Sequence, residues 1–168
     1  MASHVAHERP ARDATLPAIG WRERVSFPDW GVGRLKAKID TGARTSAIDV
    51  DEIELLPRDR VRFAVVTHRH DRDRRVWIEA PVVRLTQVRS SNGQTEQRPV
   101  VATRIKIGPV SFETQLTLVC RHGMLCRTLI GRAAVAGRFL VDAHHTHVLS
   151  RKRAPRTKQP QRHRGTEH

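Results

Sequence analysis

Aromatic residues are scarce in this sequence of 168 residues: there is no tyrosine, and Phe and Trp together make up 4%. A buried core must therefore rest on Val, Ile, Leu and Ala. Because many of these residues are β-branched and stand in short runs, strands are favoured over helices. No apolar run approaches the roughly eighteen residues that a membrane-spanning helix needs, so no membrane partner is expected.

Cysteine is also scarce, with Cys120 and Cys126 alone. The first 18 residues are polar and lack the apolar centre of a secretory signal. We therefore expect reduced thiols and a cytoplasmic location. The pair Gly31 and Gly33 lacks the third glycine and the following helix of a dinucleotide site, and no Gly-Lys-Ser/Thr loop occurs. No nucleotide-binding motif is present, and no cofactor is predicted.

Positive charge dominates, since 31 Lys and Arg against 17 Asp and Glu give a formal net charge of +14. Residues 150–168 hold seven of these basic residues, one acid, two prolines and few apolar side chains. We expect this basic tail to be disordered and to make weak phosphate contacts with nucleic acid. Residues 1–18 are expected to be a disordered leader, which leaves 19–149 as a single folded domain.

Short apolar runs separated by turn residues fill this domain. They predict strands over 19–27, 35–39, 61–67, 76–80, 82–88, 100–107, 110–119, 128–132 and 139–142. Asn92-Gly93 signals a hairpin, and 133–136 predicts one short helical segment. Short strands with turns this frequent predict an all-β domain, either a small barrel or a sandwich.

One stretch, residues 35–48, mounts a carboxylate on a tight turn between two strands. Leu35, Ala37 and Ile39 alternate toward one face, and Asp40 follows at the end of the strand. Gly42 permits a turn that a side chain would oppose, and nearby hydroxyls can hydrogen-bond the turn. Asp, Thr and Gly are also common in turns for conformational reasons alone, so the motif by itself leaves architecture and chemistry both open.

Three blocks in order carry a resemblance to a known family. They are K-I-D-T-G-A-R-T-S-A at 38–47, S-N-G-Q-T-E-Q-R-P-V-V at 91–101 and L-I-G-R at 129–132. Together they resemble the retropepsin-like aspartic proteases, and most closely the bacterial family named as ATP-dependent zinc proteases, which often accompanies RimK-type peptide ligases. The resemblance covers about residues 19–149 and implies a small closed barrel of the retropepsin type with one short C-terminal helix.

The resemblance implies an aspartic peptidase with Asp40, Thr41 and Gly42 as its catalytic turn. Such chemistry needs two carboxylates that share a proton. The chain contains a single Asp followed by Thr-Gly or Ser-Gly, so the resemblance implies a homodimer in which each chain supplies one Asp40. By the same resemblance, Thr41 braces the paired turns and Gly131 packs beneath the Asp turn.

Substrate contacts are expected from residues around that turn and from the hairpin at 90–97, which is either a flap over the substrate or an ordinary surface hairpin. The expected substrate-binding residues are Ala43, Arg44, Asn92, Gly93, Arg98 and Arg132. Together with Lys38, the arginines would attract an acidic peptide. Because the family accompanies glutamate-adding ligases, an oligo-glutamate segment is a coherent substrate.

The sequence supports no metal site. No His-Glu-x-x-His motif occurs, Cys120 and Cys126 lack zinc-ribbon spacing, and the sets His68, His70, Asp71 and His144, His145, His147 are typical of solvated surface histidines. ATP dependence has no motif either.

The alternative to a peptidase is a non-catalytic basic β-barrel that binds RNA or an acidic protein. Proteins that bind single strands stack bases on exposed rings. The seven Phe and Trp residues lie mostly in apolar strand contexts, which leaves little stacking surface and favours the peptidase.

Overall fold

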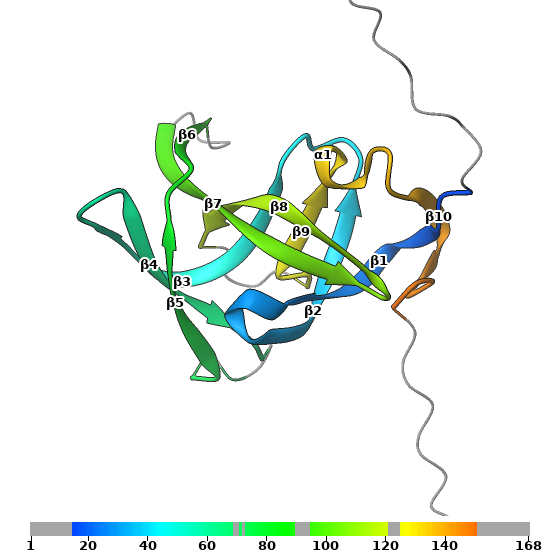
Figure 1. The fold of residues 1–168 in the computed structure, drawn as a ribbon, viewed down its shortest axis with the longest axis horizontal. Helices are drawn as coiled ribbons and strands as arrows, with labels where there is room; N and C mark the ends of the chain where they lie inside the picture. The colour runs from blue at the N-terminus through cyan, green and yellow to red at the C-terminus, as the bar shows by residue number, and fades with distance from the viewer. Residues whose placement is uncertain (1–14, 69–70, 72, 90–94, 121–124, 151–168) are drawn as a thin grey trace, which may run out of the picture.

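The structure is a computed structural model that describes residues 15–68, 71, 73–89, 95–120 and 125–150. The predicted leader up to residue 14, the tail from residue 151, and Asn92 and Gly93 lie outside these described residues. Ten strands and two short helical segments follow one another (Figure 1): β1 Ala18–Phe27, η1 Pro28–Trp30, β2 Val32–Asp40, β3 Ser46–Leu56, β4 Arg60–Val66, β5 Arg75–Pro81, β6 Arg84–Arg89, β7 Thr95–Ile107, β8 Val110–Val119, β9 Thr128–Gly131, α1 Arg132–Val135 and β10 Leu140–Thr146.

Six of the strands close into a barrel, which is one of the two all-β architectures that the short strands predicted. Their neighbour order is β1-β2-β9-β3-β8-β7, and the antiparallel pairing of Val25 with Ile107 joins β7 back to β1. The fold is therefore the closed barrel of the retropepsin type, with α1 as its short helix. Closure satisfies the backbone groups that an open sheet would leave at its two edges.

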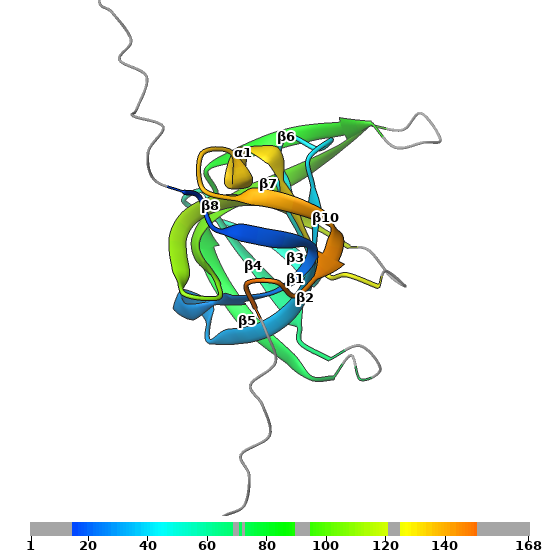
Figure 2. The same cartoon turned by 90° about the vertical axis from the view of Figure 1, so that its right-hand side faces the viewer.

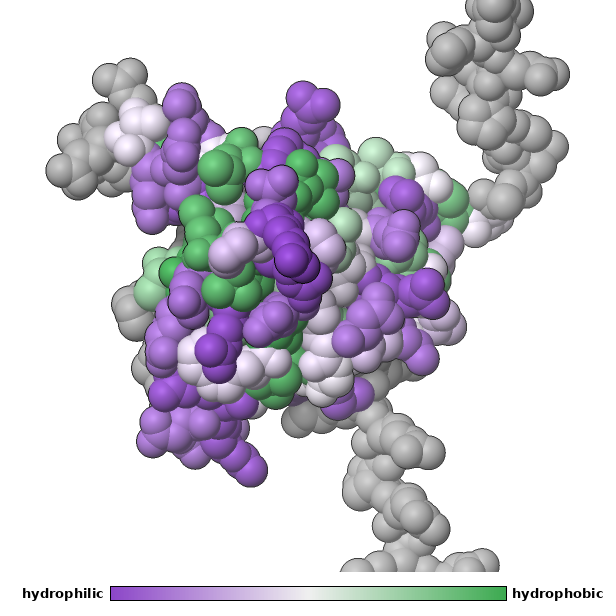
Figure 3. Space-filling view, turned by 60° about the vertical axis from the view of Figure 1, so that its left-hand side comes forward, coloured by the Kyte–Doolittle hydropathy of each residue, from purple (hydrophilic) through white to green (hydrophobic). Residues whose placement is uncertain are grey.

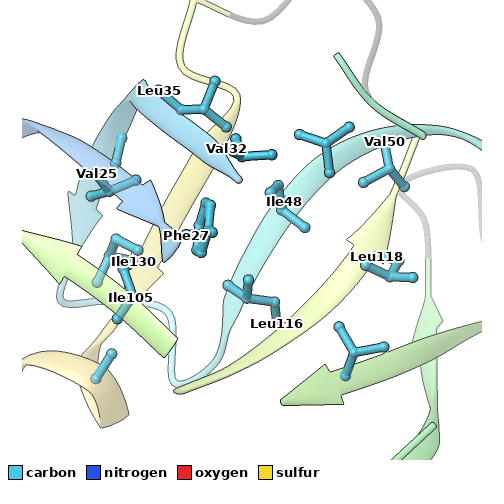
Figure 4. Packing of buried hydrophobic residues seen from close by; sticks show 14 of the residues in the cluster. Val25, Phe27, Val32, Leu35, Ile48, Val50, Ile105, Leu116, Leu118 and Ile130 are labelled. Carbon is cyan, nitrogen blue, oxygen red and sulfur yellow. The ribbon is translucent and has the colours of Figure 1, made fainter. Parts of the chain in front are cut away.

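The barrel interior is filled by aliphatic side chains and a few aromatic rings. Figure 4 shows the alternate residues of several strands pointing toward one another: Val25, Phe27, Val32, Leu35, Ile48, Val50, Ile105, Leu116, Leu118 and Ile130. Each of these is at most 5% exposed. Period-two alternation in β2 and β7 places one set of side chains inside and leaves a polar set outside.

Three further strands extend the barrel. The β4–β5 hairpin is joined through β4 to β3 and projects from the barrel at the left of Figure 1, while β6 pairs with β7. Figure 3 shows that apolar surface on this side of the molecule is interrupted by strongly polar side chains. Ile53, Leu55, Val83 and Leu85 are among the exposed apolar residues here. This surface is therefore partly apolar and partly polar. In the fold, β4, β5 and β6 extend the sheet.

The C-terminal segment is fastened to β1 through a buried carboxylate. β10 runs parallel to β1 (Figure 2), and the chain after it returns to place Leu149 and Ser150 beside Glu23. The Glu23 carboxylate is fully buried and accepts N–H groups from Gly20 at 2.7 Å, Leu149 at 3.1 Å and Ser150 at 3.0 Å, and also the Ser150 hydroxyl. Four hydrogen bonds compensate the burial of one charge.

Most predicted strands match within a few residues, and the differences have local causes. The acidic stretch after Ile48 was not predicted as a strand, yet it forms the second half of β3 because β4 pairs with it. Pro81 was expected to separate two strands, but it is the last residue of β5, at the free edge of that hairpin where a missing N–H costs nothing. The last strand begins at Leu140 and is longer than predicted because it pairs with β1.

Candidate active site

The Asp40 turn connects two strands that are not neighbours. β2 ends at Asp40 and β3 begins at Ser46, and β9 lies between them, parallel to β2 and antiparallel to β3. The register places Asp40 directly beside Gly131. The turn must therefore cross over the end of β9, so the two sequence blocks at Asp40 and Gly131 form one structural unit.

Gly131 lies so close to this turn that no side chain fits. A Cβ on Gly131 would be 2.4 Å from the Thr45 carbonyl oxygen and 2.8 Å from the Arg44 carbonyl oxygen. Both neighbours are backbone atoms, which cannot rotate away as a flexible side chain could. The Gly131 N–H donates to the buried Ser46 Oγ at 3.0 Å. Gly131 thus packs directly beneath the turn, as the resemblance implied.

The Asp40 carboxylate is held by its own turn. Its Oδ1 accepts the N–H groups of Gly42 and Ala43, both at 3.1 Å. Within the described part of the chain, Oδ2 accepts no hydrogen bond. Asp40 is half-buried, while Thr41 and Gly42 are exposed. One oxygen is therefore fixed in orientation, and the other is available to a water molecule, a substrate or a second chain.

The segment after Gly131 clamps the turn from the other side. The N–H of Arg132 donates to the Ala43 carbonyl at 2.7 Å, and the N–H of Ala133 donates to the Arg44 carbonyl at 3.0 Å. The Arg132 guanidinium donates to the Thr41 carbonyl at 2.8 Å. The structure thus places Arg132 against the turn backbone, where its observed contact orients the turn.

A cavity of about 610 Å³ opens beside the turn. Residues 44–46 form one wall, and α1 with the residues after it, β8, β7 and β6 form the others. Its charged lining consists of three arginines and one acid: Arg44, Arg84, Arg138 and Glu113. Arg84 also donates to the Gln115 side chain. An excess of cations around an open cavity favours a ligand with negative charge.

The predicted substrate-binding residues have different surroundings. Arg44 is exposed and lines the cavity, and Ala43 is half-buried in the turn. Arg98, on β7, forms an ion pair with Glu96 on the same strand, with Nη2 and Oε2 2.9 Å apart. Asn92 and Gly93 lie outside the described residues. Of the substrate-binding set, Ala43, Arg44 and Arg132 thus gather at the turn.

Sequence reasoning missed several residues of the cavity wall, namely Arg84, Glu113, Gln115 and Arg138. They come from β6, β8 and the loop after α1, and no local motif marks them. Alternation along a strand could have predicted which residues of β6 and β8 point outward. It could not have predicted that these strands face the turn.

Most of the aromatic residues are buried or half-buried, as expected. Phe27, Phe63 and Phe139 are buried, but Trp77 on β5 is 44% exposed. The Arg62 guanidinium lies over its ring at 4.6 Å from the centroid. An arginine therefore already covers part of the exposed ring.

The described side chains do not match a zinc site. Within that part of the chain, no group of three or more His, Cys, Asp or Glu residues is close enough to hold a metal ion. His145 Nδ1 instead lies 2.7 Å from the Asp142 carboxylate, and this contact, with backbone hydrogen bonds, lowers the pKa of Asp142 to about 2. None of the described helices is long and apolar enough to cross a membrane.

Comparison with known proteins assigns this geometry to a family. The family model for RimB-like proteins, described as retropepsin-like aspartic endopeptidase RimB, matches residues 18–152. A Legionella pneumophila protein of unknown function, solved by structural genomics, has a similar fold: the TM-score is 0.66, the identity is 26%, and the match covers 79% of this chain and 98% of that one.

Two curated relatives are longer proteins. The chain is 36% identical over 137 residues to a probable alpha-L-glutamate ligase of Shewanella pealeana, and 37% identical over 134 residues to one of Parasynechococcus marenigrum. These matches cover 80% and 78% of this chain but only 30% and 29% of the relatives. The chain therefore spans less than a third of the length of either relative.

Proposed function

This chain belongs to the RimB-like family of retropepsin-like aspartic endopeptidases, and we propose that it hydrolyses peptide bonds with Asp40 as its catalytic residue. The observation that carries the proposal is the Asp40 turn itself. The carboxylate stands at the end of a barrel strand, two backbone N–H groups orient Oδ1, and Gly131 supports the turn from below. This arrangement fixes a carboxylate in position for proton transfer.

The chain supplies one such turn, so we propose that the active site forms in a homodimer. Two Asp40 carboxylates across a two-fold axis cannot both be ionised at close range, and they would share one proton. The ionised carboxylate would take a proton from the attacking water. The protonated one would donate to the scissile carbonyl oxygen, and the roles reverse as the intermediate collapses.

The neighbouring residues have positioning roles in this proposal. Thr41 and Gly42 are exposed on the single chain, which suits residues that a second copy and a substrate would cover. The hydrogen bond from Arg132 to the Thr41 carbonyl would keep the turn in register while the partner docks. Arg132 is then a positioning residue, and Asp40 is the group that contacts the reacting atoms.

The central experiment compares Asp40→Asn with Asp59→Asn in a peptide-library hydrolysis assay. Both substitutions exchange a carboxylate for an amide of the same shape. Asp59 is an exposed residue at the turn before β4, so its variant controls for the loss of one negative charge and for differences in protein preparation. Asp40→Asn should lose at least about a hundredfold in kcat, because an amide cannot act as the base. Asp59→Asn should keep full activity, and light scattering should show both variants as dimers.

Mixing the two forms tests the shared site. If wild-type and Asp40→Asn chains exchange freely at equal amounts, about one quarter of the dimers contain two wild-type chains. Activity per wild-type chain should then fall to about half. If total activity instead falls only in proportion to the amount of wild-type chain, so that activity per wild-type chain is unchanged, a single chain is active. Cleavage that persists in Asp40→Asn would refute the role of Asp40.

We propose that the substrate is acidic, with glutamate-rich peptides included. Two observations support this. Three arginines and one glutamate line the cavity beside the turn, and the two longer relatives are named as probable alpha-L-glutamate ligases. A peptidase that acts on glutamate-rich segments would reverse what such a ligase builds. The cations would steer the substrate and hold its carboxylates.

Arg44→Glu tests the substrate class, with Arg58→Glu as a control of equal charge change on the β3–β4 turn. Because Arg44 lines the cavity, its reversal should raise KM for acidic peptides about tenfold or more, and leave KM for neutral peptides unchanged. Arg58→Glu should change neither. Equal effects of Arg44→Glu on both peptide classes would refute the acidic preference while leaving the peptidase proposal intact.

A non-catalytic barrel that binds RNA or an acidic protein is the competing function, and the net charge of +14 favours it. It predicts no cleavage by the wild type and equal ligand binding by wild type and Asp40→Asn. That pair of results would replace the peptidase proposal.

A further inference from the structure

Like charges face one another across β1 and β2 on the outside of the barrel. The strand register pairs Arg24 with Lys36, and Arg22 with Lys38. Leu35 and Ala37 point into the core, so the lysines between and beside them point outward. Like charges directly opposite one another destabilise a sheet. The arrangement is therefore unfavourable for the isolated chain unless an anion neutralises it.

Two more cations extend this row at the end of β2 that lies away from Asp40. A cavity of about 250 Å³ is lined by Arg24, Arg34 and Lys106, together with the hydroxyl residues Ser26 and Ser150. A second cavity of about 260 Å³ shares Arg24 and Arg34 and adds Lys36. Neither lining includes an acidic residue among those described. We call Arg24, Arg34, Lys36 and Lys106 the basic patch.

The cations of the basic patch have no anionic partner within the described chain. None of the four takes part in an ion pair there, and the buried Arg24 Nε has no hydrogen-bond acceptor. The nearest buried acid, Glu23, is already engaged by Gly20, Leu149 and Ser150. The patch therefore carries an excess of positive charge that no ion pair among the described residues offsets.

The positive potential of the basic patch affects a neighbouring histidine. His147 follows β10, and its N–H donates to the Arg22 carbonyl. Burial lowers the pKa of His147, and the charges of Arg24, Arg22 and Lys36 lower it further, against an opposing contribution from Glu23. The cations thus act together on a group beside them.

We propose that the basic patch is a binding site for the phosphodiester backbone of a nucleic acid, separate from the Asp40 turn. Asp40 lies six positions after Arg34 along β2, which corresponds to about 20 Å of strand. Arg34 and Lys36 are two residues apart on one face, or about 7 Å, which is comparable with the separation of successive phosphates on an extended strand. Arginine, lysine and serine side chains are the usual phosphate contacts.

The sequence beyond the patch favours a nucleic acid over an acidic protein. Ser150 lines the first cavity, and the next three residues are Arg151, Lys152 and Arg153. In the sequence, a residue of the cavity wall is therefore followed directly by further cations. Contacts made to phosphates alone carry no sequence information, so RNA and DNA single strands should bind with similar affinity.

Fluorescence anisotropy of labelled oligouridine and oligodeoxythymidine tests the proposal on the full chain. The variant Arg34→Gln/Lys36→Gln/Lys106→Gln should bind both about tenfold more weakly at physiological salt, and its salt slope should be smaller by about 2, because three phosphate contacts are lost. The control Arg58→Gln/Arg60→Gln/Arg62→Gln removes the same charge from the β3–β4 region and should bind like the wild type. Single Arg34→Gln, at an exposed position, gives a smaller loss of affinity if the triple variant fails to fold.

Three results would overturn the proposal. The first is equal weakening by the patch and control variants, which would mean that net charge alone is sensed. The second is wild-type binding too weak to measure. The third is that the patch variant binds poly-L-glutamate more weakly than the wild type does but binds the oligonucleotides equally well. This result would assign the patch to an acidic polypeptide. The experiment does not involve Asp40, so its outcome is independent of the proposed peptidase activity.

Discussion

Replacing Gly131 by alanine should destabilise the domain and displace the Asp40 turn. The added Cβ would lie 2.4 Å from the Thr45 carbonyl oxygen and 2.5 Å from its carbon. Ordinary van der Waals contact begins at 3.4 Å, so the backbone of the turn must retreat by about 1 Å. This movement would also strain the hydrogen bond from the Gly131 N–H to Ser46 Oγ.

The expected cost is at the upper end of the range for overpacking, about 3 kcal/mol, because the obstructing atoms are backbone and cannot adopt another rotamer. For a domain of this size, a loss of about 3 kcal/mol lowers Tm by roughly 6–12 °C. A displacement of about 1 Å at a catalytic group costs roughly a hundredfold in rate, so any hydrolysis that depends on Asp40 should fall by that amount.

Thermal unfolding followed by circular dichroism measures the first effect, and peptide hydrolysis below Tm measures the second. Gly33→Ala is the matched control, because an added Cβ at Gly33 meets no atom within 4 Å. Its Tm should stay within about 2 °C of the wild type. If Gly131→Ala is as stable as Gly33→Ala, the turn is not packed on Gly131 as the structure indicates, and Asp40 and Gly131 do not form one structural unit.

Two further predictions concern the C-terminal segment. Glu23→Gln should cost about 2–3 kcal/mol at neutral pH, because the amide cannot accept all the hydrogen bonds from Gly20, Leu149 and Ser150. Chemical denaturation measures this loss, and the exposed Glu79→Gln should cost much less. The pKa of His147 in the folded chain lies below its ordinary value of 6.5, so the unfolded chain binds more protons as pH falls below about 6.5. Stability should therefore decrease in that window, and His147→Asn should decrease less steeply; an unchanged pH dependence would contradict the assignment.

Local patterns in the sequence were sufficient for much of the fold. Alternation in residues 110–119 gave β8 with the observed bounds, because side chains in its first half alternate between half-buried and exposed positions, although residues 116–119 are buried throughout. The strand predicted over 128–132 and the helical segment predicted over 133–136 were also placed within a residue. The acidic half of β3 was missed, since its strand form depends on pairing with β4 rather than on its own side chains.

The residues of the candidate site likewise fall into two groups, those that a local pattern marks and those that only the tertiary structure brings together. The catalytic role of Asp40, Thr41 and Gly42 came from the resemblance and stays a prediction, but their place on a turn after a strand could be predicted from a local pattern. Arg84, Glu113 and Arg138 could not, because they come from separate elements and meet only around the cavity. Buried Glu23 was missed for the same reason: its partners at residues 149 and 150 are more than a hundred positions away.

The sequence by itself determined that the chain is an all-β domain, that it carries one Asp-Thr-Gly turn, and that its charge is strongly positive. These properties depend on residue type and short-range spacing. Only the tertiary structure decided that β9 inserts between β2 and β3, that the backbone of Arg44 and Thr45 leaves no room for a side chain at Gly131, and that Arg24, Arg34, Lys36 and Lys106 form one patch. Strand order and cross-strand register bring these residues together, and both are set by packing of the whole barrel rather than by any local pattern.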